Sequence, residues 1–135
     1  MSKILDFTFH TVSEYKCTLK SVAELLKKAS LSVTDSDNKF HIMNDDYDFE
    51  VLSIKYKEFL KLPQNTRFKV FGDKIRETEV TITEENSFSL CISAYIVKTE
   101  YEGILIPDFN FYYSHLYHKV NANSTIIERM DFMEF

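Results

Sequence analysis

Residues that interrupt helices and strands are scarce in this chain: of its 135 residues, two are Gly and two are Pro. Glycine-rich phosphate loops, nucleophile elbows and dinucleotide-binding fingerprints each need several glycines at fixed spacings. Gly72 and Gly103 are too far apart to form any of these motifs. The sequence therefore lacks the common signatures of catalysis, and it favours a non-enzymatic protein without a bound cofactor.

Length and composition predict one folded domain spanning residues 1–135. Hydrophobic residues make up 44% of the chain and charged residues 27%, as in ordinary globular proteins. The net charge of −5 argues against a protein that mainly binds phosphate backbones or anionic membranes. No signal peptide or long apolar segment is visible, so we expect a cytoplasmic location in a bacterium or a host cell. Abundant Lys, Asn, Ile and Phe indicate AT-rich codons, as in a low-GC bacterium, its phage or a large DNA virus.

Alternation of apolar and polar residues predicts most of the secondary structure to be strand. The pattern covers residues 5–10, 67–71, 79–83 and 88–96, and the turn at 84–86 indicates an antiparallel hairpin. Shorter strands are expected at 40–43, 104–106 and 125–133. One helix is predicted at about 21–30, where Ser21 and Glu24 form a capping-box pattern before an apolar stripe. These elements predict a single α+β domain, a mainly antiparallel sheet with one or two helices packed on one face.

Two segments fit both helix and strand. Residues 49–62 carry apolar side chains at helical spacing but also alternate around Ile54, and a helix is favoured. Residues 108–120 fit a helix that begins after Pro107, with Asp108 at its start. Their density of aromatic residues is typical of a strand instead. The sequence leaves this second choice open.

An acidic segment spans residues 35–50 and includes Asp45, Asp46 and Asp48. No register of this segment supplies both the Gly and the Glu that an EF-hand loop requires, so a calcium site is not expected. A solvated acidic loop is the simpler interpretation, and such a loop can steer a basic partner.

The densest aromatic cluster contains Tyr112, Tyr113 and Tyr117. Helix and strand periodicity each bury about half of such a cluster and leave the other half exposed. Exposed Tyr side chains are enriched at protein interfaces. A fully buried aromatic core is the competing interpretation. On the interface interpretation, we expect these three residues, together with the acidic aspartates, to contact a protein partner.

A basic segment with interleaved aromatic residues follows at 51–76 and predicts an alternative function. Lys55, Lys57, Phe68, Lys69 and Phe71 are its candidate contacts, because single-stranded nucleic acid binders combine cations with stacking rings. The last residues, 130–135, are similar to the acidic, Phe-terminated tips of some single-stranded DNA-binding proteins, but they lack the acidic linker that precedes such tips. Amphipathic elements with a solvated Lys face explain the same pattern.

The remaining reactive side chains form no recognisable site. His115 and His118 are close enough to share a metal on a helix but not on a strand, and no third ligand follows at a zinc-site spacing. Cys17 follows Lys16 and is best interpreted as a half-buried thiol. The sequence thus favours a small protein that binds a protein partner stoichiometrically, such as an inhibitor, an immunity protein or a phage or viral host antagonist. It does not indicate which partner, or which oligomeric state.

Overall fold

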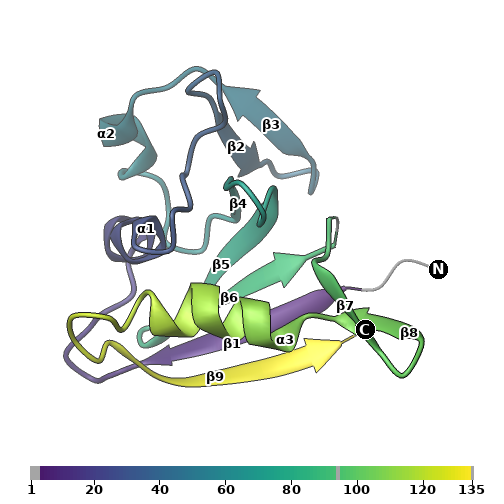
Figure 1. Ribbon diagram of the computed structural model, residues 1–135. Coiled ribbons are helices and arrows are strands. Elements are labelled where there is room, and N and C mark those ends of the chain that lie inside the picture. The colour runs from purple at the N-terminus through teal and green to yellow at the C-terminus, as the bar shows by residue number, and fades with distance from the viewer. Residues whose placement is uncertain (1–3, 94, 135) are drawn as a thin grey trace.

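The computed structural model describes residues 4–93 and 95–134, and a seven-stranded antiparallel sheet forms its centre (Figure 1). The strand order is β3-β2-β4-β5-β6-β1-β9. These strands are β1 (Leu5–Thr11), β2 (Phe40–Met43), β3 (Phe49–Leu52), β4 (Phe68–Val70), β5 (Thr78–Glu84), β6 (Ser87–Ile92) and β9 (Ile127–Glu134). A separate hairpin consists of β7 (Lys98–Tyr101) and β8 (Ile104–Pro107). The helical elements are α1 (Leu19–Lys27), α2 (Tyr56–Phe59), α3 (Phe109–Tyr112) and η1 (Tyr113–His118), a π-helix that continues α3 directly. The α+β fold expected from the sequence is confirmed.

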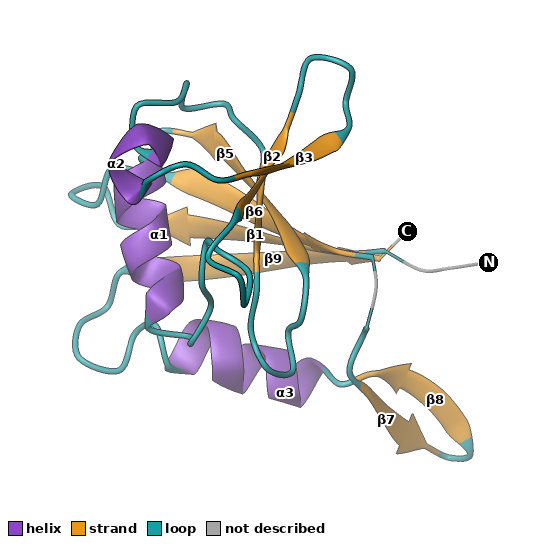
Figure 2. Cartoon of the chain, turned by 90° about the horizontal axis from the view of Figure 1, so that it is seen from above, coloured by secondary structure: helices purple, strands orange, loops and turns teal. Residues whose placement is uncertain are grey.

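Helices α1 and α3 lie against the same face of the sheet (Figures 1 and 2). Leu5, Phe7 and Phe9 of β1 point toward this face and are at most 1% exposed. The ring of Phe7 packs on Tyr112 of α3 at 5.3 Å, and Phe9 stacks on Phe88 of β6 at 5.1 Å. Successive side chains of a strand point to opposite faces. The alternation in the sequence therefore identified the buried side of the central strands correctly.

Helix α1 begins before the predicted position. Its N-cap is Thr18, whose hydroxyl accepts a hydrogen bond from the backbone N–H of Ser21 at 3.0 Å. The hydroxyl of Ser21 accepts in turn from the N–H of Thr18 at 2.7 Å, which completes a reciprocal capping box. The prediction that Ser21 is the N-cap is wrong, because Leu19 is buried and already belongs to the first turn.

The ambiguous segment 49–62 contains one strand and one helix. Residues Phe49–Leu52 form β3, the edge strand that pairs with β2, and Tyr56–Phe59 form the single turn α2. The prediction of one helix throughout is wrong, because the first half of the segment forms a strand and the second half forms a helical turn. Strand β7 had no clear pattern in the sequence, because all four of its residues are exposed.

Segment 108–120 is helical. The Asp108 carboxylate accepts a hydrogen bond from the N–H of Phe111 at 3.0 Å and caps α3. Tyr112, Leu116 and Val120 then follow four residues apart, and all three are buried. The helical stripe, rather than the β-propensity of the aromatic rings, therefore describes this segment.

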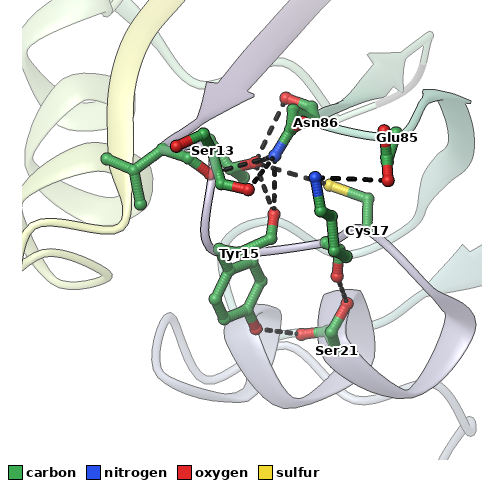
Figure 3. A network of polar contacts seen from close by, with 9 residues as sticks. Ser13, Tyr15, Cys17, Ser21, Glu85 and Asn86 are labelled. Atoms are coloured by element: carbon green, nitrogen blue, oxygen red, sulfur yellow. Dashed lines mark hydrogen bonds and ion pairs between the residues drawn. The ribbon is translucent and has the colours of Figure 1, made fainter.

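Asn86, in the turn between β5 and β6, connects the sheet to the loop before α1 (Figure 3). Its side-chain amide donates to the carbonyls of Val12 at 2.9 Å and Tyr15 at 3.0 Å. Its carbonyl accepts from the N–H of Thr11 at 2.8 Å, and the neighbouring Glu85 carbonyl accepts from the N–H of Cys17 at 2.7 Å. One polar side chain thus satisfies the backbone groups of a loop that has no regular structure of its own.

Among the helices that the structure describes, none has the length and apolar character needed to cross a membrane.

Candidate protein-binding surfaces

The β2–β3 turn, residues 44–48, is called here the acidic turn. The side-chain oxygen of Asn44 accepts hydrogen bonds from the N–H groups of Asp46 at 2.9 Å and Asp48 at 3.0 Å. The N–H of Asn44 donates to the carbonyl of Asp48 at 2.8 Å, and the N–H of Tyr47 to the carbonyl of Asn44 at 3.1 Å. The predicted contacts Asp45, Asp46 and Asp48 therefore lie in a turn that is ordered by hydrogen bonds within the turn.

Tyr47 is the most prominent side chain of the acidic turn. It is 83% exposed, and its backbone φ of 63° lies in the left-handed region. The charge pattern of the sequence indicated the neighbouring aspartates but not Tyr47 itself. An aromatic residue between acidic neighbours, at the tip of a short hairpin, is the pattern that indicates Tyr47.

A second surface follows α3 and η1. Phe109, Tyr113 and Tyr117, called here the aromatic stripe, lie four residues apart on one side of the helix. Phe109 and Tyr113 are exposed, and the rings of Tyr113 and Tyr117 stack at 5.1 Å with an interplanar angle of 13°. The ring of Phe109 meets Phe132 of β9 edge-on at 4.7 Å. The predicted contacts Tyr113 and Tyr117 thus lie on one continuous surface.

Tyr112 does not belong to this surface, although the sequence suggested it. Its side chain is 1% exposed, and its hydroxyl accepts a hydrogen bond from the N–H of Val97 at 2.8 Å. Burial raises the pKa of this phenol. Adjacent residues of a helix point about 100° apart, so Tyr112 faces the sheet while Tyr113 faces outward. Burial therefore removes Tyr112 from the predicted interface.

The acidic turn and the aromatic stripe lie on opposite sides of the molecule. In Figure 2 the loop between β2 and β3 is at the top of the view, and α3 is at the bottom, with the sheet between them. A single compact partner does not reach both surfaces in the usual footprint of about 800 Å² per partner. Each surface is therefore a separate candidate for binding.

The predicted basic and aromatic residues do not form one track. Phe68 is buried and packs against Phe59 of α2 at 5.2 Å, so its ring is not available for stacking on a base. Lys69 points to the other face of the sheet, where its ammonium pairs with Glu77. Phe71 packs against the His41 ring at 4.7 Å.

Lys55, the N-cap of α2, and Lys57, within α2, are both exposed, on a different part of the surface from Lys69. Residues 130–134, which resemble the tips of single-stranded DNA-binding proteins, form the end of β9 and pair with β1. They are therefore part of the sheet and not a free tail. Phe135 lies outside the described residues.

The two histidines of η1 contact different neighbours. The His115 ring packs on Phe111 at 4.3 Å, and its Nε2 lies 3.4 Å from the ammonium of Lys119. Burial, together with the charges of Lys119 and Lys74, lowers the pKa of His115. The His118 ring meets Tyr113 edge-on at 5.0 Å. Within residues 4–93 and 95–134, His, Cys, Asp and Glu side chains form no group of three placed to hold a metal ion.

Both thiols are less reactive than an exposed cysteine. Cys17 is buried beside Thr11, and burial raises the pKa of its thiol. Burial also raises the pKa of Cys91, which lies in β6 near the Asp6 and Glu79 carboxylates. Since the thiolate is the nucleophilic form, neither environment activates the sulfur.

The sequence predicted a strand at 104–106, which is β8, but not its partner β7 or the exposure of the β7–β8 hairpin. The hairpin projects from the molecule beside the N-terminal end of α3 (Figure 2). Tyr101, Ile104 and Leu105 near its tip are 64%, 65% and 66% exposed. A two-stranded hairpin is marginally stable in water by itself. The residues around Ile104 are apolar, and their pattern in the sequence does not distinguish an exposed strand from a strand in the core.

Comparison of the chain with protein-family models, with curated proteins and with solved structures found no match.

Proposed function

We propose that this chain is a small non-enzymatic protein that acts by stoichiometric binding to a protein partner, as inhibitors, immunity proteins and phage or viral host antagonists do. We propose the acidic turn as its contact surface. The partner then presents a basic surface with a pocket for an aromatic ring.

The exposure of Tyr47 is the observation that carries this proposal. A non-glycine residue in the left-handed region costs about 1–2 kcal/mol. Gly or Asn fits that position better, so stability alone does not favour a Tyr there. Tyr is among the residues that contribute most to protein interfaces when a partner pocket surrounds them. The hydrogen bonds of Asn44 also order the turn in advance, which reduces the entropy lost on binding.

The charges next to Tyr47 support a basic partner. Asp45, Asp46 and Asp48 flank Tyr47 in the chain, and all three aspartates are exposed. Clustered charges of one sign accelerate association with a surface of opposite sign, in a manner that salt suppresses. Such charges at the rim act mainly on the association rate, while a central aromatic residue acts mainly on the dissociation rate.

The test is capture of the partner from a lysate of the source or host by the tagged protein, after nuclease treatment. We expect one protein to be retained near 1:1 by the wild type and lost with the triple variant D45K/D46K/D48K. The matched control, E58K/E100K/E102K, makes the same change in net charge on exposed positions elsewhere. Retention by the D45K/D46K/D48K variant, or equal loss in the control, refutes the assignment of this surface.

Tyr47→Asn separates binding from stability. Asn occupies the left-handed region more readily than Tyr, so we expect the free energy of unfolding to stay the same or rise by up to about 1 kcal/mol. We expect captured partner to fall at least tenfold, because the central ring is gone. A variant that is destabilised, or that still binds at wild-type strength, contradicts the role given to Tyr47.

A further inference from the structure

Strand β9 leaves one edge of the large sheet open. It is eight residues long and pairs with β1 on one side. In the described part of the chain no strand pairs with its other side, and Figure 1 shows β9 as the outermost strand at that edge. β3, at the opposite edge, has four residues. An exposed edge presents unpaired N–H and C=O groups to which another strand can add.

The aromatic stripe lies next to this open edge. Phe109 contacts Phe132 of β9, so the stripe is on the β9 side of the helix. The opposite flank carries Phe111 and His115, near Lys74 of the β4–β5 connection. Half-exposed Phe132 extends the same apolar surface onto the strand. An open strand edge and exposed aromatic rings thus form one continuous surface.

We propose that a second copy of this chain docks on this surface, with the two β9 strands paired antiparallel about a two-fold axis through Met130. The two sheets then form one continuous sheet, and the two aromatic stripes meet above it. This interface lies away from the acidic turn and goes beyond the proposed function, since it does not depend on a second protein.

The charges of β9 select this register. An axis through Arg129 places Arg129 opposite its own copy, and an axis through Asp131 does the same for Asp131. An axis through Met130 instead places Arg129 opposite Asp131 of the second copy, twice. Opposite charges in facing positions stabilise a strand pair, and like charges destabilise it. Arg129 and Asp131 already lie on one face of β9, with Arg129 Nη2 and Asp131 Oδ2 3.3 Å apart.

The helix is aligned with the same axis. At the start of α3, Phe109 lies at the level of Phe132. Beyond the end of η1, the side-chain amide of Asn121 donates to the backbone carbonyl of Ile127 at 2.8 Å. The helix formed by α3 and η1 therefore runs antiparallel to β9. Four helical residues advance about 6 Å and two strand residues about 6.7 Å. Tyr113 therefore lies near the level of Met130, where a two-fold axis brings it close to Tyr113 of the second copy.

Sedimentation equilibrium of the purified protein with charge-swap variants tests the proposal. We expect a monomer–dimer equilibrium for the wild type. R129D and D131R each place two like-charge pairs across the axis, and each should raise the dimer dissociation constant about tenfold to a hundredfold. The double variant R129D/D131R restores opposite charges and should recover most of the wild-type affinity. Far-UV circular dichroism checks that each variant is folded.

Tyr113→Ala tests the stripe, with Ser114→Ala, an exposed neighbour in η1, as the matched control. We expect Tyr113→Ala to weaken the dimer and Ser114→Ala to leave it unchanged. A protein that stays monomeric at about 100 μM overturns the proposal. A dimer that the single charge variants do not weaken, or that the double variant does not restore, overturns it as well. If the β9 edge instead binds a strand of another protein, the purified protein stays monomeric in this experiment.

Discussion

Asn86→Ala is expected to destabilise the fold more than its partly buried position in a turn suggests. The amide of Asn86 lies within hydrogen-bond distance of the Val12, Tyr15 and Ser13 carbonyls and the Thr11 hydroxyl. The closest two acceptors are the carbonyls of Val12 and Tyr15. An amide has two hydrogens, so about two full hydrogen bonds are lost on substitution.

The magnitude follows from these contacts. A neutral hydrogen bond contributes about 0.5–1.5 kcal/mol, so the two contribute about 1–3 kcal/mol together. The carbonyl of Tyr15 also accepts from the Thr11 hydroxyl at 2.8 Å, and the carbonyl of Val12 also accepts from the N–H of Tyr15 at 3.0 Å. Both carbonyls therefore keep one partner, and no penalty for an unsatisfied group is added. We expect the free energy of unfolding to fall by about 1–3 kcal/mol. For a chain of this size, that corresponds to a decrease in Tm of about 3–15 °C.

Urea denaturation followed by circular dichroism measures this loss, with an unchanged m-value as the sign that the folded state is still compact. Asn86→Asp removes both donors without changing the shape of the side chain, and should lose at least as much stability. Asn123→Ala, in an exposed loop, is the control and should change stability by less than about 0.5 kcal/mol. If Asn86→Ala behaves like this control, the loop before α1 does not depend on Asn86.

Two further predictions concern packing and charge. Gly72→Ala should destabilise the protein by about 1–3 kcal/mol in the same unfolding assay, because the new Cβ would lie 2.9 Å from the backbone carbonyl oxygen of Ile75. His115 should titrate below its ordinary value of 6.5 in an NMR pH titration, because of burial and the charges of Lys119 and Lys74, and Lys119→Ala should raise its pKa. Since the unfolded chain then binds more protons, this histidine should reduce stability as the pH falls through and below 6.5.

The central strands were predictable from the sequence because each has one buried and one exposed face. Residues 5–10 and 88–92 alternate cleanly, and the structure buries the apolar half of both. Segment 49–62 was predicted incorrectly. A strand at the sheet edge and a single helical turn each bury too few side chains to produce a clear hydrophobic periodicity in the sequence. β7 lacks a buried side chain altogether, so its sequence contains no pattern to recognise.

The candidate surfaces were predictable in part. The exposed carboxylates at 45–48 and the exposed ring of Tyr113 were found, since charge and a helical stripe both appear in the sequence. The burial of Tyr112 depended on which side of a helix faces the sheet, and this requires the helix to be placed first. The separation of the two surfaces depends on long-range strand order, which local patterns do not encode.

The scarcity of glycine, which constrained the function most, also affects the backbone. Among the residues that the structure describes, five non-glycine residues adopt positive φ values: Ser30, Asn38, Tyr47, Tyr95 and Glu102. Small or polar side chains at such turns are solvated at little further cost, but the two tyrosines place large rings in solvent. The Tyr95 ring has a partner within the chain, because the guanidinium of Arg76 lies 5.1 Å from its centroid. Tyr47 is more exposed still, at 83%. Its position is explained by neither turn geometry nor packing within the described chain, and the partner proposed above would supply the stabilisation that the fold does not.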